Sequence, residues 1–196
     1  LERDGMLDHA LEMAGRLFYN DDITDLNVDV RRAPLNEVLD KIQEHLHDNH
    51  APTFYTGSTT IDACLPGLRS ENDVPFKDHG FEPLASIWIG NRTLVSCHHD
   101  APNNLACCVV GRRRFTVFPP EQIINLYPGP LDPTPGGQAI SMVDFANPDF
   151  EKYPRFREAI AAGQVADMEP GDAIFLPSLW WHQVEATEPV NMLVNY

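Results

Sequence analysis

The chain has 196 residues, enough for one domain with a sizeable hydrophobic core. Hydrophobic residues make up 43% and charged residues 22%, as in ordinary globular proteins, whereas 17 prolines and 12 glycines favour many short strands and turns. With 14 Lys and Arg against 29 Asp and Glu, the formal net charge of −15 would repel a phosphate backbone, so nucleic acid is a disfavoured partner.

The cysteines and the apolar runs bear on where the protein works. The four cysteines lack the spacing of a disulfide framework, which favours a reducing compartment. No apolar run approaches the length of a membrane span, and the opening "LERDGMLDHALEM" lacks the basic-then-apolar pattern of a signal peptide. We therefore expect a soluble, cytoplasmic protein without a membrane segment.

The first 50 residues are expected to be helical. Over residues 5–19, apolar residues recur at helical spacing, at Leu7, Leu11, Ala14 and Phe18. A second helix is predicted for "APLNEVLDKIQEHLHDNH", with Pro34 in its first turn. Its buried stripe is expected to consist of Leu35, Val38, Leu39, Ile42 and Leu46. Because the chain begins inside a predicted helix and ends inside a predicted strand, we expect a segment of something longer.

From Phe54 to Tyr196 short apolar runs are separated by proline, glycine and asparagine, and seven of them are interpreted as strands. These are "PTFYTGST", "PLASIWIG", "TLVSCHHD", "LACCVVG", "RFTVFPP", "DAIFLPS" and "VNMLVNY". They favour a sandwich or a barrel. Residues 125–157 break the pattern with a long Pro- and Gly-rich connection, of a kind that is usually functional or mobile, and "EKYPRFREAIAAGQ" is expected to close it with a short helix. We thus expect one mainly β domain over residues 1–196, with a helical part at 1–50 and a β core at 51–196 that carries the insert.

Two histidines and an aspartate stand together in "TLVSCHHDA". If this stretch is a strand, His98 and Asp100 share one face, while Cys97 and His99 point the other way. A His-x-Asp pair offers one nitrogen and one oxygen to a metal ion and needs a third ligand from elsewhere. The alternative is a pair of exposed polar residues at the end of a strand.

A third ligand is available in "EPGDAIFLPSLWWHQVEA". Proline and glycine turn into a strand that Pro177 ends, and His182 follows after two tryptophans. Together with His98 and Asp100, it would complete the set of two histidines and one carboxylate that is typical of non-haem Fe(II) oxygenases. The alternative for His182 is a core histidine packed against aromatic neighbours.

The stretch "LACCVVGRRRFTV" is interpreted as one continuous strand. One of its faces would carry Leu105, Cys107, Val109, Gly111, Arg113, Phe115 and Val117. Arg113 would be the only polar side chain there, and a buried cation needs an anion. The carboxylate of a small acid, held by both arms of the guanidinium, would supply it. The alternatives are an internal Asp or Glu, or a register break at Gly111 that turns Arg113 outward.

Three stretches carry a family resemblance: "CHHDAPNNLACCVVGRRRFTVFPPEQ", "VDFANPDFEKYPRF" and "PGDAIFLPSLWWHQVE". They resemble the Fe(II)/2-oxoglutarate oxygenases of the JmjC, or cupin-like, group, and within it the asparaginyl hydroxylases that act on hypoxia-inducible factor. The string G-x5-P-x4-H is similar to the second motif of the cupins, although Leu179 stands at its usual glycine. The likeness covers Ile87 to Tyr196 well and is thinner upstream, where it includes "FYTGST". It implies a double-stranded β-helix, or jelly roll, and hydroxylation of a protein side chain or a small molecule with Fe(II), 2-oxoglutarate and O₂.

Carried over by position, the resemblance implies iron ligands at His98, Asp100 and His182. Arg113 falls where the hydroxylases use a lysine for the distal carboxylate of 2-oxoglutarate. Further residues of the cosubstrate pocket are implied at Tyr55, Asn104 and Asn195. Val95 stands in place of a threonine whose hydroxyl lies near the cosubstrate, which leaves the strength of cosubstrate binding and the substrate open.

Other interpretations stay open at this point. Trp180, Trp181 and the segment from Asn125 to Arg157 are taken as walls of the substrate groove, with core packing as the alternative for the tryptophans. The rival functions are a cupin metalloenzyme that does not use 2-oxoglutarate and a non-catalytic ligand-binding cupin. Arg113 favours the oxygenase, because the rivals give no reason for an inward arginine. The negative charge suits a basic peptide or protein loop, no aromatic cage for a methylated cation is visible, and a homodimer is left open.

Overall fold

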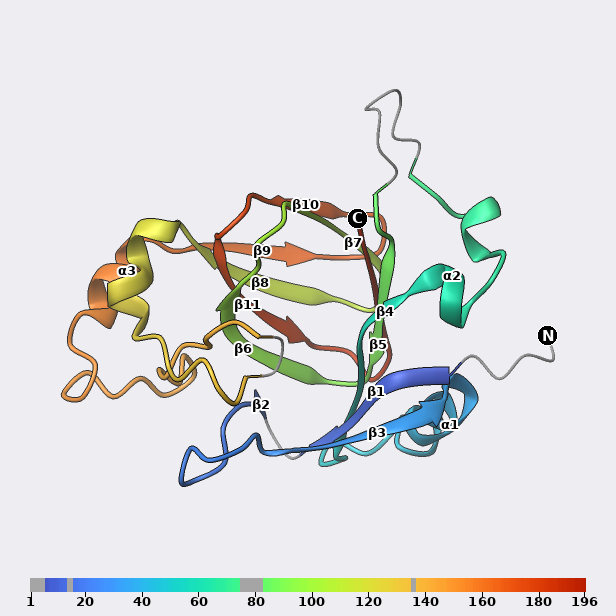
Figure 1. The fold of residues 1–196 in the computed structure, drawn as a ribbon, viewed down its shortest axis with the longest axis horizontal. Coiled ribbons are helices and arrows are strands. Elements are labelled where there is room, and N and C mark those ends of the chain that lie inside the picture. The colour runs from blue at the N-terminus through green and yellow to red at the C-terminus, as the bar shows by residue number, and fades with distance from the viewer. Residues whose placement is uncertain (1–5, 14–15, 75–82, 135–136) are drawn as a thin grey trace.

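The computed structural model describes residues 6–13, 16–74, 83–134 and 137–196, and its strands form two sheets that face each other (Figure 1). The strands are β1 (Met6–Met13), β2 (Arg16–Leu17), β3 (Val28–Pro34), β4 (Thr53–Thr60), β5 (Ser86–Gly90), β6 (Thr93–His99), β7 (Asn104–Val110), β8 (Arg113–Phe118), β9 (Gln164–Met168), β10 (Ala173–Leu176), β11 (Trp181–Ala186) and β12 (Asn191–Asn195). The helical segments are α1 (Leu35–Glu44), α2 (Ile61–Cys64), η1 (Leu68–Ser70), η2 (Pro120–Leu126) and α3 (Phe156–Ala162).

The described strands are ordered β10-β7-β12-β5-β4-β1-β3 in a seven-stranded sheet and β2-β6-β11-β8-β9 in a five-stranded sheet. Successive strands from β5 to β8, and again from β10 to β12, alternate between the two sheets. This alternation makes the sandwich a jelly roll, and it confirms the predicted mainly β fold. It also brings residues that are far apart in sequence onto two facing inner surfaces.

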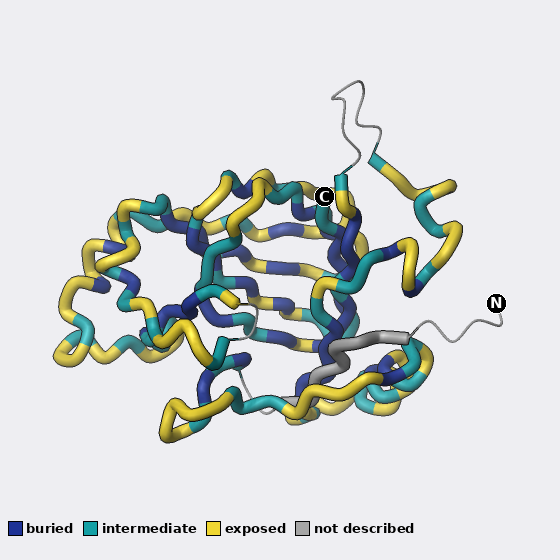
Figure 2. The backbone as a smooth tube through the Cα atoms, in the orientation of Figure 1, coloured by how far each residue is buried: buried dark blue, intermediate teal, exposed yellow. Residues whose placement is uncertain are grey.

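The core between the sheets follows the period-two alternation of β-strands. From the five-stranded sheet Phe115 and Val184 point inward, and from the seven-stranded sheet Ala106 and Leu193 meet them. Figure 2 shows buried residues alternating with more exposed ones along these strands, and mostly exposed residues on the loops that leave them. The interior therefore has two walls, and polar side chains on either wall can converge.

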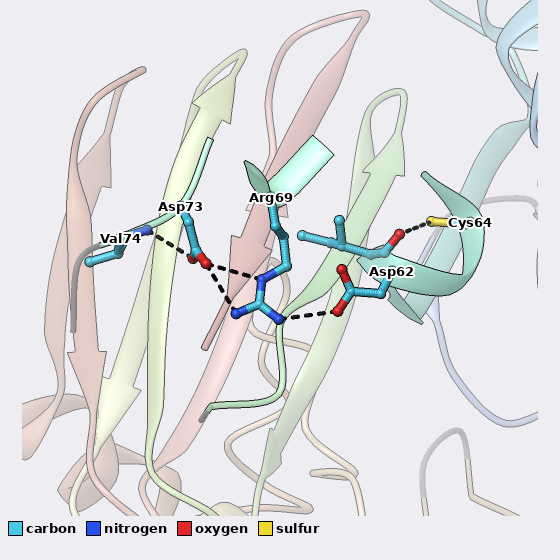
Figure 3. A network of polar contacts seen from close by, with 6 residues as sticks. Asp62, Cys64, Arg69, Asp73 and Val74 are labelled. Carbon is cyan, nitrogen blue, oxygen red and sulfur yellow. Dashed lines mark hydrogen bonds and ion pairs between the residues drawn. The ribbon is translucent and has the colours of Figure 1, made fainter. Parts of the chain in front are cut away.

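The outer face of the seven-stranded sheet is covered by α1 and α2. Val38 and Ile42 of α1 are buried against the sheet, which confirms the predicted second helix, but Leu39 of the predicted stripe is exposed. After α2, Arg69 lies between Asp62 and Asp73, with contacts of 3.1 Å and 3.0 Å (Figure 3). These ion pairs fix the surface segment that follows β4.

The prediction of a helix over residues 5–19 is wrong. Met6–Met13 form β1, which pairs antiparallel with β3 and with β4, and Arg16–Leu17 form β2, which pairs parallel with β6. Residues 5, 14 and 15 lie outside the described residues. Main-chain hydrogen bonds to two neighbouring strands outweigh a helical spacing of apolar residues, because intrinsic propensity is a weak preference that tertiary context overrides. The N-terminal part is therefore mostly an extension of the sheet.

The seven predicted strands are all present, as β4, β5, β6, β7, β8, β10 and β12. The interpretation of residues 105–117 as one strand is wrong, because Gly111, with φ 76°, turns the chain from one sheet to the other. A Cβ at this position would collide with the side chain of Asn191 and the carbonyl of Val190, so only glycine fits.

The turn at Gly111 resets the alternation of buried side chains. β7 buries Ala106 and Cys108 instead of the predicted face that begins with Leu105. β8 nevertheless buries Arg113, while Arg114 is exposed and paired with Asp167 at 2.7 Å. Arg113 therefore points inward as predicted, although the predicted strand that led to it is broken.

The insert packs on the outer face of the five-stranded sheet. Its predicted closing helix is present as α3, and its apolar residues, among them Val143 and Phe156, surround Phe118 and Trp181. Trp181 is 1% exposed and belongs to this outer core, so its interpretation as a wall of the substrate groove is wrong. None of the helices in the described ranges has the length and apolar character needed to cross a membrane.

Candidate metal and cosubstrate site

His98 of β6 and His182 of β11 lie opposite each other in the ladder, with ring centroids 4.4 Å apart. The ladder shifts register between this pair and the next pair, Val95 and Val184. β6 therefore contains a β-bulge, and two residues three positions apart, Val95 and His98, face the same interior. Cys97, as predicted, points to the other side and is buried in the outer core with Trp181.

Asp100 follows directly after β6, and its carboxylate lies 3.6 Å from Nε2 of His182. Among the described residues, His98, Asp100 and His182 form a group whose possible ligand atoms all lie within 4.8 Å of one another. The structure thus brings His182 next to His98 and Asp100, although it follows Asp100 by 82 positions in the sequence. This convergence is not explained by the alternatives, which were a pair of exposed polar residues at the end of a strand and a core histidine packed against aromatic neighbours.

Two loops are tied together around Asp100. The backbone N–H of Leu179 donates to the carbonyl of Asp100 at 2.9 Å, and the hydroxyl of Ser178 donates to the carbonyl of Ala101 at 2.5 Å. The backbone N–H of Ser178 donates to Oδ1 of Asn103 at 2.9 Å. Leu179 has φ 65°, the left-handed conformation that favours glycine, which accounts for glycine being the usual residue at this place of the motif. These bonds fix Asp100 relative to the strand that carries His182.

The protonation of the two histidines suits a metal. Nδ1 of His98 contacts the carbonyl of Ser96 at 2.9 Å, and Nδ1 of His182 contacts the carbonyl of Trp180 at 3.1 Å. A carbonyl oxygen only accepts hydrogen bonds, so Nδ1 carries a proton in both rings, and Nε2 is the ring atom left to bind a metal. Burial lowers the pKa of His182 to about 4, so this imidazole is neutral at pH 7.

The donor set fits Fe(II). Two imidazole nitrogens and one carboxylate oxygen form the facial arrangement that non-haem Fe(II) oxygenases use, with the remaining positions of the metal free for other ligands. His182 is 5% exposed at its side chain, while Asp100 is 31% exposed, so the group is closed toward the sandwich and open on one side. The carbonyl contacts at Nδ1 orient both rings, as supporting partners of metal ligands usually do.

Arg113 is buried in the same interior, with 3% of its surface exposed. In the ladder it lies opposite Ala186, four residues along β11 from His182, which corresponds to about 13 Å along the strand. Its Nε has no hydrogen-bond partner, and no carboxylate of the described residues forms an ion pair with it. The alternatives of an internal Asp or Glu partner and of an outward Arg113 are therefore wrong for the described residues. Burial lowers the pKa of Arg113, because charge is disfavoured away from water.

The three further predicted pocket residues lie on the opposite wall. Burial raises the pKa of Tyr55, which is 4% exposed on β4; the charge of Arg113 acts against this shift, and the charge of Asp100 adds to it. Tyr55 is thus within electrostatic range of both. Asn104 begins β7, just after the loop that carries Asp100, and Asn195 pairs with Ala106 two residues further along β7.

Unpaired polar atoms gather in this interior. Among the described residues, the buried Oδ1 atoms of Asn104 and Asn195 have no hydrogen-bond partner, and neither has Nε of Arg113. Buried polar groups are almost always paired, so several that lack a partner among the described residues and face one interior fit a polar ligand that would pair them. The amides lie toward the metal ligands and the guanidinium lies at the far end, an arrangement that fits a molecule with polar groups at both ends. A diacid such as 2-oxoglutarate has this character.

Sequence reasoning missed Trp88 of β5. Its ring stacks with Tyr55 at a centroid distance of 5.9 Å, it packs against the core between the sheets, and its Nε1 is buried without a partner. The signal was available: in the predicted strand "SIWIG", Trp88 stands between two isoleucines and must face the wall opposite to theirs. Ile87 and Ile89 are buried under the helices on the outer face, which leaves Trp88 for the interior.

Comparisons with known proteins agree with the fold. Residues 6–196 match the family described as the cupin-like domain. HSPB1-associated protein 1 of Homo sapiens is 35% identical over 129 residues, which cover 63% of this chain and 26% of that protein. The protein named lysine-specific demethylase JMJ31 of Arabidopsis thaliana is 35% identical over 133 residues, 66% of this chain and 23% of that protein.

The chain therefore spans about a quarter of the length of these curated relatives. Among solved structures, the X-ray structure of E. coli ycfD superposes with a TM-score of 0.52 at 17% identity, covering 96% of this chain and 40% of that one. At this identity the likeness concerns the fold. These comparisons do not show a specific closeness to the asparaginyl hydroxylases.

Proposed function

The chain belongs to the family of cupin-like domains, and on that premise we propose that it is an Fe(II)/2-oxoglutarate-dependent oxygenase. The observation that carries the proposal is the pairing of a facial His98, Asp100 and His182 group with a buried arginine for which the described residues supply no anion. The metal group alone would suit many cupin metalloenzymes. Arg113 favours an enzyme with an anionic ligand over other cupin metalloenzymes. The anion would lie near Ala186, four residues along β11 from His182.

The residues at one end of the site would bind the metal, and those at the other end would bind the distal carboxylate of the cosubstrate. His98, Asp100 and His182 would hold the metal and leave its other positions open. At the far end, Arg113 would hold the distal carboxylate of 2-oxoglutarate with two parallel hydrogen bonds, and the phenol of Tyr55, which burial keeps protonated, would donate a further one. At the metal end, Asn104 and Asn195 would hydrogen-bond to the ligands around the metal.

The chemistry itself would come from the metal and the cosubstrate. Bound Fe(II) would supply the activation of O₂, coupled to the oxidative decarboxylation of 2-oxoglutarate. The protein's part is geometry and the exclusion of water. Between the two ends the walls are apolar, with Val95 and Val184 opposite each other, so the cosubstrate would be enclosed except on the side of Asp100. Val95 offers no hydroxyl there, so the hydrogen bonds would come from the residues at the two ends.

The proposed reaction is hydroxylation of a protein side chain. Two observations support a protein substrate: the net charge of −15 suits a basic segment, and one relative carries the name of a lysine-specific demethylase. The likeness of three sequence stretches to the asparaginyl hydroxylases favours hydroxylation as the outcome. Demethylation is the second candidate, favoured by the name of that relative.

The test measures metal and cosubstrate binding before turnover. Protein purified without oxygen and loaded with Fe(II) should bind 2-oxoglutarate and convert it to succinate once O₂ is admitted, and His98→Ala should abolish this conversion. Metal binding without any binding of 2-oxoglutarate would favour a cupin enzyme of another class. Absence of metal binding in the wild-type chain would favour a non-catalytic ligand-binding domain and would overturn the proposal.

A further inference from the structure

Trp88 carries a buried polar group for which the described residues supply no partner. It lies on β5, between β4 and β12, and packs from the seven-stranded sheet into the core between the sheets. Its indole Nε1 is enclosed and unpaired. An indole nitrogen can only donate, so it needs an acceptor, and the described residues provide none.

The position of Trp88 places this donor near the far end of the site. In the sheet, Trp88 lies opposite Leu193, and Leu193 lies opposite Cys108 on its other side. The thiol of Cys108 is within electrostatic range of Arg113, as is Tyr55, on which Trp88 stacks. Trp88 is therefore at the level of Arg113, and Asn104 and Asn195 lie closer to the metal ligands.

A buried donor without an acceptor destabilises a fold, whereas an apolar ring of similar shape would fill the same space without that penalty. Phenylalanine would do so here. We propose that the indole N–H of Trp88 donates a hydrogen bond to the distal carboxylate of the cosubstrate, beside Arg113 and Tyr55. This inference rests on the proposed function, and it names a residue that makes the site select a diacid over a monoacid.

The first test compares two ligands on two proteins. Calorimetry on Mn(II)-loaded wild type and Trp88→Phe, without oxygen, measures the affinity for 2-oxoglutarate and for 2-oxopentanoate, which keeps the keto acid and the chain length but lacks the distal carboxylate. Loss of a hydrogen bond to a charged group should weaken 2-oxoglutarate binding about 10-fold to 100-fold. The affinity for 2-oxopentanoate should change by less than about 2-fold, because no acceptor faces the indole in that complex.

A stability measurement separates a binding role from a structural one. Without ligand, Trp88→Phe should unfold at the same or a higher denaturant concentration than the wild type, because it removes an unpaired donor. A structural role would lower that midpoint. The inference would be overturned if both proteins had the same affinity for 2-oxoglutarate. It would also be overturned if Trp88→Phe weakened the binding of 2-oxoglutarate and of 2-oxopentanoate by the same factor.

A measurement on the wild type does not depend on the variant folding. The chain has three tryptophans, so the nuclear magnetic resonance spectrum of the ¹⁵N-labelled, Zn(II)-loaded protein contains few indole N–H signals. On addition of 2-oxoglutarate the signal of Trp88 should move downfield, and with 2-oxopentanoate it should stay. An unmoved signal in a protein that binds 2-oxoglutarate would refute the role of Trp88 alone, whereas a wild type that binds neither acid would refute the proposed function and this role with it.

Discussion

Two arginines in two regions of the molecule differ in whether the described residues supply carboxylate partners for them. On the surface, Arg69 lies between Asp62 and Asp73, and the whole group stays in contact with solvent (Figure 3). In the interior, Arg113 is almost completely buried and forms no ion pair with a described carboxylate. The first arrangement is complete within the chain and holds a segment in place. The second would be completed by the ligand that we propose.

The same contrast holds for the neutral polar groups of the interior. Asn104, Asn195 and Trp88 face the same interior as Arg113, and each has a buried atom for which the described residues supply no partner. Folding tolerates a few such groups when their function requires them, because the rest of the core supplies the stability. The unpaired atoms are therefore the groups that the proposed ligand would pair, and changes at the two arginines and at the candidate metal group test this view.

The largest effect is expected at the metal group. His182→Ala removes one of three ligands and leaves a polar cavity, so the affinity for Mn(II) or Co(II) should fall by more than about 100-fold, since losing even a supporting partner of a ligand costs 10-fold to 100-fold. Titration of the metal-free protein by calorimetry measures this. His47→Ala, at an exposed position, is the matched control and should bind like the wild type. Unchanged affinity in His182→Ala would place the metal elsewhere.

The next effect separates the two arginines. Arg113→Met removes one side of a buried, charge-assisted contact, which should weaken 2-oxoglutarate binding by about 2–5 kcal/mol, or at least about 30-fold. Without ligand the same variant should be as stable as the wild type or more stable, by up to about 4 kcal/mol, because an isolated buried charge is removed.

Arg69→Met is the control for that comparison. It breaks both surface ion pairs, so it should lower stability slightly and leave the affinity for 2-oxoglutarate unchanged. Denaturant unfolding and calorimetry on both variants give the two quantities. The proposed difference between the two arginines would be wrong if Arg113→Met lowered the stability of the ligand-free protein and left the affinity for 2-oxoglutarate unchanged.

A smaller effect is expected at the loops around Asp100. Ser178→Ala removes the hydroxyl that donates to Ala101, so Asp100 is held less firmly and metal affinity should fall about 10-fold. Ser178→Thr keeps a hydroxyl and should restore most of the affinity. The d–d absorption spectrum of the Co(II)-loaded variant reports the geometry of the ligands, and an unchanged spectrum with unchanged affinity would show that Ser178 has no such role.

The smallest expected effect concerns acid stability without metal. Burial lowers the pKa of His182 from its ordinary value of 6.5 to about 4, so between these values the unfolded chain binds a proton that the folded chain does not. Stability should therefore fall as the pH decreases from 6.5 to 4, with at most about 1.4 kcal/mol per pH unit from this residue. His182→Gln should show a flatter dependence in denaturant unfolding at a series of pH values. A slope as steep as that of the wild type would contradict the assignment.

Much of the fold and of the metal group could be predicted because both depend on local patterns. Short apolar runs bounded by proline, glycine and asparagine indicated the seven strands, and alternation within one of them placed His98 on a face opposite to Cys97. The strand β1 could not be found in this way, because its partners β3 and β4 lie later in the chain. Whether such a segment is a strand depends on pairing that a short window of sequence does not contain.

The pocket was harder to predict than the metal ligands. Arg113 was placed inside on the assumption of one continuous strand, and the turn at Gly111 that breaks this strand happens to restore the inward direction. Trp88 was missed because an indole in an apolar run reads as core, and only the absence of a partner for Nε1 reveals a further purpose. The extent of the domain, the cytoplasmic location and a homodimer stay predictions.

Because of the β-bulge in β6, Val95 and His98 face the interior, while the two residues between them, Ser96 and Cys97, bond to other parts of the chain. Ser96 donates from its hydroxyl to the carbonyl of Leu17 at 2.7 Å, and the carbonyl of Cys97 accepts from the backbone N–H of Ser141 in the insert at 2.7 Å. Deleting one of these two residues would leave Val95 and His98 on the inner face, now by simple alternation, but would remove an attachment on the outer edge. The length of this strand thus sets how the insert is anchored beside the metal ligands, and relatives that differ by one residue there should differ first in their inserts.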